Sequence, residues 1–278
     1  MTKMSETFSI YLERRMARIL LLGIISGFPW VLIGSSLSLW LKEDGLSRST
    51  IGWAGLIFSV YAVNFLWAPL IDRLRVPYLT PRLGHRRAWI VTLQALILVC
   101  LGGWSLVDPS ANLWAVIAIG LVIAIASATQ DITIDALRIE QIGAGEGRSM
   151  AAGAAIAVVG WWTGYKLGGV VALNTAQAFQ SAGIENYWQT TFLVLGTIVI
   201  ACNIALMFVP EQSPEERVAD QLEQDNIIAS NLALSGQKGQ VVAWWVGTVM
   251  GPWLRFFRRN RSEEHTSELQ SRTNLGCR

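Results

Sequence analysis

Two carboxylates lie close together in an otherwise apolar part of the sequence. Residues 127–138 read SATQDITIDALR and contain Gln130, Asp131, Asp135 and Arg138. On a helix, residues 131, 135 and 138 share one face, and residue 130 lies about 100° away. A charge near the centre of a membrane costs about 3 kcal/mol on insertion scales, so such groups pair or line a polar pathway. We therefore expect Gln130 and Asp131 to face a pathway and Asp135 to pair with Arg138 at a gate. A structural ion pair that caps the helix is the alternative.

A single cation lies in a second apolar stretch, GWWTGYKLGG. Lys166 follows Tyr165 there, near the centre of the expected membrane span and too deep to reach either surface easily. We expect Lys166 either to pair with Asp131 on a neighbouring helix or to bind an anionic substrate, with Tyr165 lining the same pathway. A buried pair of this kind would suit proton coupling.

The composition is that of a membrane protein. Of 278 residues, 52% are hydrophobic and only 15% are charged, and the mean hydropathy is +0.40; a soluble domain has about 25% charged residues. The three cysteines and two histidines are too scattered for a disulfide framework or a His-based metal site: Cys100, Cys202, Cys277, His85 and His265. The sequence has no nucleophile-elbow, phosphate-loop or zinc-protease motif, so we expect no enzyme, no cofactor, no metal and no nucleic-acid partner.

Six stretches are apolar enough to cross a membrane, which takes about 20 residues each. Because backbone groups in lipid must be hydrogen-bonded within their own segment, these stretches are predicted to be helices. They cover residues 17–41, 50–70, 88–106, 113–137, 149–173 and 187–209. The first follows a polar, basic N-terminus and is too long for a signal peptide, so we expect it to remain in the membrane.

The short connections predict the orientation of these helices. Lys and Arg gather in the N-terminal segment and in the second and fourth connections, whereas the third and fifth have none. Because positive residues favour the cytoplasmic side, both ends of the bundle are expected to face the cytoplasm.

Four regions follow from the changes in composition. Residues 1–210 are the predicted six-helix bundle, and residues 211–240 an acidic cytoplasmic linker. Residues 241–260 are apolar, aromatic and basic at their end, which is typical of an interfacial helix or of the approach to a further span. Residues 261–278 differ in character and match a translated sequencing adapter, so they are left out of the functional argument. We expect the chain to be the N-terminal half of a longer protein and to be inactive by itself.

Small residues at helical spacing predict close helix packing. Gly23 and Gly27 lie in the first span, and Gly160, Gly164 and Gly168 in the fifth. Such spacing lets two helix backbones approach each other. Pro29, within the first span, removes a backbone hydrogen bond and predicts a kink.

The connection between the second and third spans resembles a signature of the major facilitator superfamily, Gly-x-Leu-x-Asp-Arg-x-Gly-Arg-Arg. Here the Asp-Arg is Asp72-Arg73, and the Gly-x-Arg-Arg is Gly84, Arg86 and Arg87. The leading Gly is replaced, and extra residues separate the two halves. The resemblance implies an all-α bundle, the six-helix N-terminal half of a transporter, in which Asp72 and these arginines form a cytoplasmic gate.

More specifically, residues 11–260 resemble the AmpG family of muropeptide permeases within that superfamily. The matching stretches are SGFPWVLIGSSLSLWLKEDGLSRSTIG (26–52), FLWAPLIDR (65–73), LGHRRAWIVTLQ (83–94) and SATQDITIDALRIE (127–140). Lys166 stands where that family usually has Arg, which keeps the cation but loses its bidentate geometry.

This resemblance implies proton-driven import of anhydro-muropeptides from the periplasm across the bacterial inner membrane, for peptidoglycan recycling and, through the imported ligands, β-lactamase induction. The partners would be membrane lipid, the muropeptide, a proton and the missing C-terminal half. An acetyl-coenzyme A carrier of the same superfamily is an alternative. A membrane-embedded sensor or enzyme is another, for which the sequence shows neither a ligand domain nor a catalytic constellation.

Overall fold

A computed structural model describes residues 9–142 and 146–211, together with residues 222–223, 226–228, 230, 242 and 244–250. Contacts divide the chain into two units. The first comprises Met1–Ala68 and Arg75–Gln212, and the second Pro69–Leu74 and Ser213–Arg278. The first unit contains all the predicted spans apart from the last residues of the second, and each unit is considered by itself.

The six predicted membrane spans are confirmed. The first consists of α2 (Arg14–Trp30), a π-helical segment η1 (Val31–Ser36) and α3 (Leu37–Glu43). The second consists of α4 (Arg48–Ala54), η2 (Gly55–Phe58), α5 (Ser59–Val63) and η3 (Asn64–Leu66), and the short α6 (Ala68–Arg73) and α7 (Thr80–Leu83) follow. The remaining spans are α8 (His85–Trp104), α9 (Leu113–Glu140), α10 (Gly147–Ser181) and α11 (Tyr187–Leu206). All regular structure in the described part of the chain is helical.

The boundaries differ most for the fifth span, which was predicted to cover residues 149–173. The helix α10 continues to Ser181. The prediction followed the end of the apolar run, whereas a helix rich in Ala and Gln can extend into water at little cost. The apolar run therefore ends before the helix does, and the helix ends only near Gly183, whose φ is +77°.

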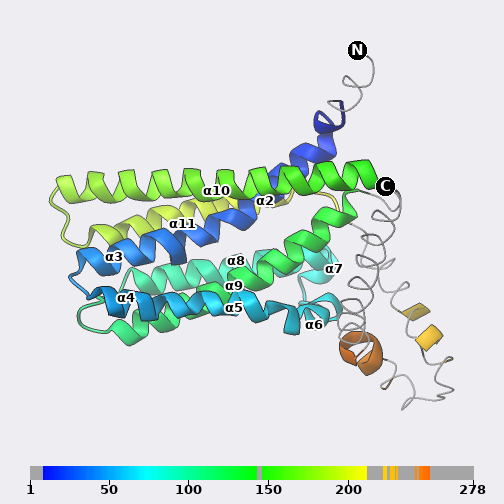
Figure 1. Ribbon diagram of the computed structural model, residues 1–278, viewed down its shortest axis with the longest axis horizontal. Helices are drawn as coiled ribbons and strands as arrows, with labels where there is room; N and C mark the ends of the chain where they lie inside the picture. The colour runs from blue at the N-terminus through cyan, green and yellow to red at the C-terminus, as the bar shows by residue number, and fades with distance from the viewer. Residues whose placement is uncertain are drawn as a thin grey trace, which may run out of the picture. The chain divides into compact units, whose positions relative to one another are not determined.

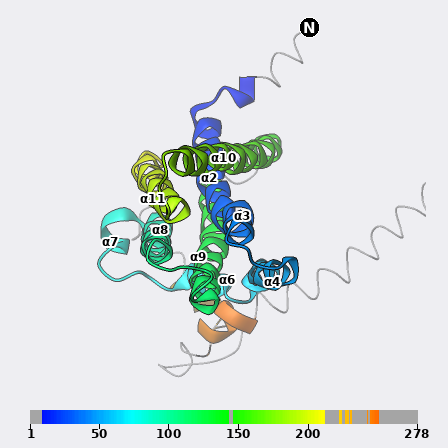
Figure 2. The ribbon, with the colours of Figure 1, turned by 90° about the vertical axis from the view of Figure 1, so that its left-hand side faces the viewer.

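The first span occupies the middle of the first unit. Figure 2 shows α2 and α3 end-on, with α10, α11, α8, α9 and α4 around them. In Figure 1, α10 runs along the upper edge of this bundle and α5 along the lower edge. Toward the end where α3 finishes, Trp40, Trp104 and Phe192 pack with ring centroids 4.9–6.0 Å apart. This aromatic core joins three spans.

The small residues lie where α2 crosses α10. A Cβ added to Gly27 would lie 2.0 Å from the carbonyl oxygen of Trp161, and one added to Gly164 would lie 2.3 Å from that of Ile24. Gly23 and Gly160 face each other in the same way, and Gly168 lies against Phe28. The two backbones are therefore in direct contact.

Of the second unit, the structure describes residues 69–74, which include most of α6, and the short pieces between 222 and 250 given above. The last of these pieces contains a π-helical segment, η4 (Val246–Met250). The predicted linker (211–240), the predicted interfacial segment (241–260) and the tail (261–278) lie mostly or wholly outside the described residues. Those predictions, and the orientation of the two ends, stay predictions.

Candidate functional site

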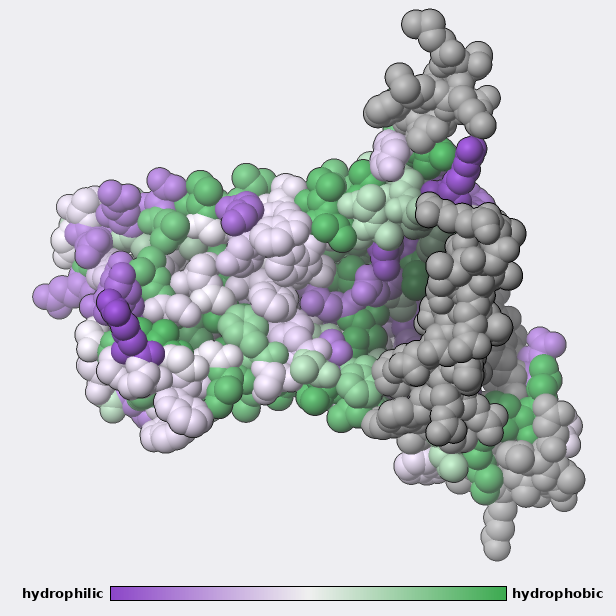
Figure 3. All heavy atoms as spheres, viewed as in Figure 1, coloured by the Kyte–Doolittle hydropathy of each residue, from purple (hydrophilic) through white to green (hydrophobic). Residues whose placement is uncertain are grey.

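A cavity of about 400 Å³ lies between α2, α9 and α10, all within the first unit. One wall is formed by small residues and Trp161 of α10, and α9 contributes Asp131, Asp135 and Arg138. Ser26 of α2 completes the polar lining. Figure 3 shows hydrophilic side chains gathered in a hollow below α10 on this face of the bundle. The three charged residues predicted to share one helix face thus line one cavity.

Asp131 is bound across the helix interface. The hydroxyl group of Ser26 donates a hydrogen bond of 2.6 Å to its carboxylate. Trp30 and Tyr61 lie close to the same carboxylate. The indole NH of Trp30, the hydroxyls of Tyr61 and Ser127 and the Oε1 atom of Gln130 are buried, without a hydrogen bond of standard geometry to the described residues. Because such groups are costly to bury, Trp30 and Tyr61 beside the Asp131 carboxylate make this a candidate site.

Gln130 does not line this cavity, and its place on a transport pathway stays a prediction. Its side chain is fully buried, and its Nε2 atom donates to the carbonyl oxygen of Ile25 at 3.2 Å. Pro29, four residues after Ile25, has no NH group to bond to that oxygen. Gln130 therefore replaces the hydrogen bond that Pro29 removes, and it fastens α9 to α2.

Asp135 and Arg138 form the ion pair that their spacing predicts. The Arg138 Nη2 atom lies 3.1 Å from the Asp135 Oδ1 atom. The Asp135 side chain is 66% exposed and that of Arg138 only 18%, so the pair lies at the rim of the cavity. An exposed ion pair within one helix contributes little to the stability of the fold. The pair is therefore of interest for its position at the entrance of the cavity.

Lys166 does not pair with Asp131. It follows Gly164 by two residues, which places it about 200° around α10 from the glycines that face α2. Its side chain is exposed, and its Nζ atom lies 5.5 Å from the ring centroids of both Trp162 and Tyr165. Tyr165 is partly buried and stacks on Trp161. The prediction of a Lys166–Asp131 pair is wrong because the glycine seam determines which face of α10 turns inward.

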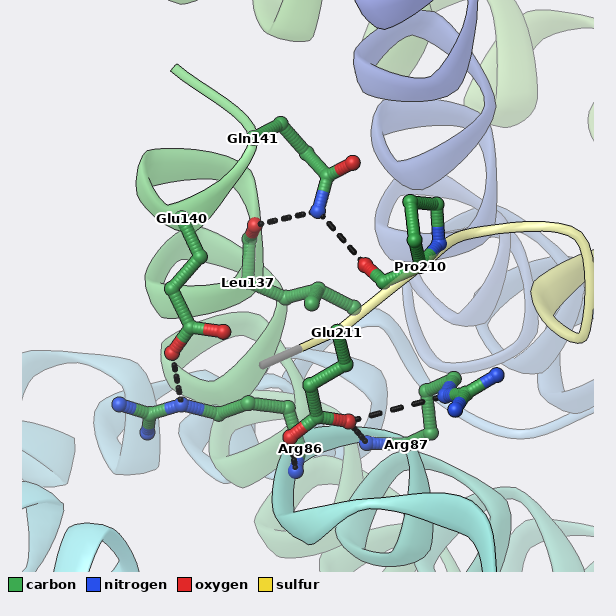
Figure 4. A network of polar contacts seen from close by, with 7 residues as sticks. All are labelled: Arg86, Arg87, Leu137, Glu140, Gln141, Pro210 and Glu211. Carbon is green, nitrogen blue, oxygen red and sulfur yellow. Dashed lines mark hydrogen bonds and ion pairs between the residues drawn. The ribbon is translucent and has the colours of Figure 1, made fainter. Parts of the chain in front are cut away.

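Arg86 and Arg87 begin α8 and bind two carboxylates that the sequence prediction did not include. Glu211 accepts hydrogen bonds from the backbone NH groups of Arg86 (2.5 Å) and Arg87 (2.9 Å), and the Arg87 guanidinium lies 3.7 Å away. The Arg86 side chain extends to Glu140, at 3.2 Å. Figure 4 shows this network, in which Gln141 also donates to the carbonyl oxygen of Pro210 at 2.8 Å. The start of α8, the end of α9 and the segment after α11 are thereby joined.

Asp72 and Arg73 lie in α6, in the segment that belongs to the second unit. A gate formed by Asp72 with the arginines of α8 therefore stays a prediction. The partners that the sequence analysis did not predict are nevertheless visible in the sequence. Glu140 ends the stretch that begins at residue 127, and Glu211 begins the acidic segment directly after the sixth span. Ser26 is likewise a polar residue in an apolar span.

Comparison with known proteins identifies the family of this chain. The sequence profile of the Major Facilitator Superfamily matches residues 19–261. The chain is 34% identical to the anhydromuropeptide permease of Escherichia coli (strain K12) over 220 residues, which is 79% of this chain and 42% of the relative. It is 30% identical to the putative transporter AmpG 4 of Rickettsia conorii over 250 residues, which is 90% of this chain and 54% of the relative.

The chain spans about half the length of these curated relatives. No solved structure matches it. The relatives are named as a transporter and a permease, which describes movement of a solute rather than catalysis, and the names do not favour an acetyl-coenzyme A carrier. With six helices of membrane-spanning length among its described residues, the chain is a multi-pass protein of the bacterial inner membrane and belongs to the Major Facilitator Superfamily.

Proposed function

We propose that this protein imports anhydro-muropeptides into the cytoplasm by alternating access, driven by the proton gradient. The names of the relatives support the substrate class. The observation that carries the proposal is the Asp131 carboxylate, which lines a cavity between three membrane-spanning helices and is held by Ser26 of a second helix. Burial of a carboxylate within a membrane span costs free energy, and such residues typically mark the path of a solute or an ion.

In this mechanism Asp131 binds the proton. When Asp131 is charged, the Ser26 hydroxyl stabilises the carboxylate across the interface between α2 and α9. Protonation removes the charge, which lowers the cost of a conformation in which the cavity is closed to water. Proton binding and closure of the cavity are then coupled.

The other polar residues have separate roles in the proposal. The Asp135–Arg138 pair lies at the rim of the cavity and acts as a gate, together with Asp72, Arg73, Arg86 and Arg87. Tyr165 and the exposed Lys166 contact the substrate in this proposal. In transporters of this kind the site lies between two halves of the protein, so the part of the protein beyond this chain would supply the opposite wall.

Uptake of a labelled anhydro-disaccharide tripeptide tests the proposal, in bacteria that lack their own permease and express the complete reading frame. We expect accumulation that a protonophore abolishes. Asp131→Asn removes the titratable group, so accumulation against a gradient should be lost while exchange of labelled for unlabelled substrate continues.

The matched control is Asp108→Asn, which removes a carboxylate from the connection between α8 and α9, outside the cavity. It should accumulate substrate as the wild type does. Wild-type-like accumulation by Asp131→Asn at equal membrane expression would exclude Asp131 as the proton carrier. Absence of uptake by the wild type would exclude the substrate class.

A further inference from the structure

A row of aromatic side chains extends from the wall of the cavity. The rings of Trp161 and Tyr165 are nearly parallel, at 14°, with centroids 5.6 Å apart. Trp30 of α2 meets Trp161 edge-on at 5.5 Å, and Tyr61 of α5 lies 4.6 Å from Trp30. The row therefore crosses three of the six spans, and Trp161 belongs both to the row and to the lining of the cavity.

The position of this row excludes the usual reason for Trp and Tyr in a membrane protein. These residues gather at the two membrane interfaces, where their polar atoms reach the headgroups. Trp161 and Tyr165 instead lie near the middle of α10 (Gly147–Ser181), and Trp30 lies near the middle of the first span, Arg14–Glu43. The row is at mid-depth, so it does not anchor the protein in the interface.

The orientation of α10 makes the row continuous with the cavity. Ala154, Ala157, Val158 and Trp161 line the cavity, and Tyr165 follows Trp161 by four residues, which places it on the same flank of the helix. Figure 3 shows residues of intermediate hydropathy across the middle of this face. A ligand in the cavity can thus meet the row at Trp161, the ring that belongs to both.

Opposite charges flank the row. The Asp131 carboxylate lies beside Trp30, and the Lys166 ammonium group lies 5.5 Å from the Trp162 and Tyr165 rings. Flat aromatic faces with a few fixed polar groups around them are typical of small-molecule sites. A pyranose ring has the matching form, since one face presents C–H groups and its edge carries hydroxyl and acetamido groups.

We propose that the row formed by Trp30, Trp161 and Tyr165 is the saccharide subsite, on which the amino-sugar rings of the substrate lie. The Lys166 ammonium group binds a carboxylate of the same substrate, and Ser26 and Asp131 face the polar edge of the sugar nearest the cavity. The inference rests on the proposed function and adds to it the orientation of the substrate. A purely apolar ligand would offer no polar contact to either charged group.

The aromatic part of the proposal is tested by the KM for uptake of the anhydro-disaccharide tripeptide. Trp161→Leu keeps an apolar side chain but removes the ring face, so KM should rise about tenfold, whereas Trp161→Phe should restore most of the affinity. Trp114→Leu is the matched control, because Trp114 is 81% exposed at the start of α9 and lies outside the row.

The charged part is tested with a second probe, the same tripeptide with its carboxylates amidated. Lys166→Gln should raise KM about tenfold for the charged substrate and leave KM for the amidated one unchanged; Lys166→Arg should behave as the wild type. A structural role of Lys166 would affect both probes equally.

The outcomes separate the two proposals. If the wild type takes up neither probe, the proposed function fails. If the wild type transports but Trp161→Leu has the same KM as Trp114→Leu at equal membrane expression, the saccharide subsite is wrong. If Lys166→Gln changes KM equally for both probes, or for neither, the carboxylate contact is wrong.

Discussion

Glu211 is a buried carboxylate whose position depends on a residue without a side chain. Its side chain is 1% exposed and accepts from the first backbone NH groups of α8. A Cβ added to Gly84 would lie 2.5 Å from the Glu211 Oε2 atom, and the φ of Gly84 is +97°. Glycine is therefore required at position 84 both for its backbone conformation and for the space it leaves.

Replacement of Gly84 by Ala should lower stability beyond the cost of backbone strain. The backbone conformation of Gly84, with φ +97° and ψ +167°, is essentially restricted to glycine, so alanine there costs about 1–3 kcal/mol in strain. Displacement of Glu211 adds about 1.5–3 kcal/mol for each hydrogen bond to a charged group that is lost. The thermal midpoint of the purified protein in detergent measures the effect. Gly183→Ala is the matched control, since its φ is +77° and nothing lies within 4 Å of the added Cβ. Equal midpoints for the two variants would show that Glu211 moves aside freely.

At the scale of elements, the contact between α2 and α10 determines which side chains reach the cavity. The seam of five glycines brings the two backbones together and turns Trp161 toward the cavity and Lys166 away from the seam. The carbonyl oxygen freed by Pro29 is bound by Gln130, which adds α9 to the same arrangement. The geometry of the site is thus set by one helix crossing.

A methyl group in this seam should separate the helices. In Gly27→Ala the Cβ would lie 2.0 Å from a backbone carbonyl oxygen that has no room to move within a helix, so we expect a loss of about 1–3 kcal/mol from overpacking. Loss of thermal stability in detergent is the measurement. Gly169→Ala, on α10 with nothing within 4 Å of its Cβ, should melt as the wild type or slightly higher because alanine favours the helix. The idea fails if Gly27→Ala is as stable as Gly169→Ala.

At the scale of the whole first unit, polar contacts fasten the two ends of the bundle differently. At the end where α8 begins, Arg15 pairs with Glu146 at 2.7 Å and donates to Ser149, in addition to the network around Glu211. At the opposite end, Glu43 accepts hydrogen bonds from Tyr187 and Trp188, at 2.8 and 2.6 Å. One end depends on ion pairs, and the other on a carboxylate bound by uncharged donors.

These contacts predict a pH dependence that is confined to one end. Hydrogen bonds from Arg15 and Ser149 lower the pKa of Glu146 below its usual 4.5. A lowered pKa in the folded state gives stability that is present above pH 4.5 and is lost as the pH falls through the folded value. Hydrogen exchange in the first turn of α10 should therefore rise between about pH 5 and pH 3, after correction for the intrinsic rate.

The opposite end supplies the internal control. Partial burial and the charge of Asp108 raise the pKa of Asp44, so its protonation on acidification relieves repulsion there instead of breaking a contact. Hydrogen exchange of the backbone amides around residue 44 should therefore not rise on acidification as it does in the first turn of α10. In Glu146→Gln the acid-dependent increase at α10 should disappear, and its persistence would assign the effect to another group.

Most of what a single element determines could be predicted from the sequence. The six spans follow from apolar length because lipid leaves the backbone no alternative to a helix. The Asp135–Arg138 pair follows from a spacing within one helix, and the glycine seam from small residues repeated every four positions. The end of α10 was misjudged because the apolar run ends before the helix does.

Only the tertiary structure decided how these helices face one another. Lys166 and Asp131 are each correctly placed in a span, yet the rotation of α10 on its glycine seam points Lys166 elsewhere. Gln130 is next to Asp131 in sequence, but its amide binds the carbonyl oxygen of Ile25 on α2, which Pro29 leaves without its usual helical partner. Glu211 reaches Arg86 across 125 residues of sequence. The sequence by itself determines which residues lie in membrane-spanning helices. Which of these residues contact one another depends on the rotation of each helix, and that rotation is set by all of its neighbours at once.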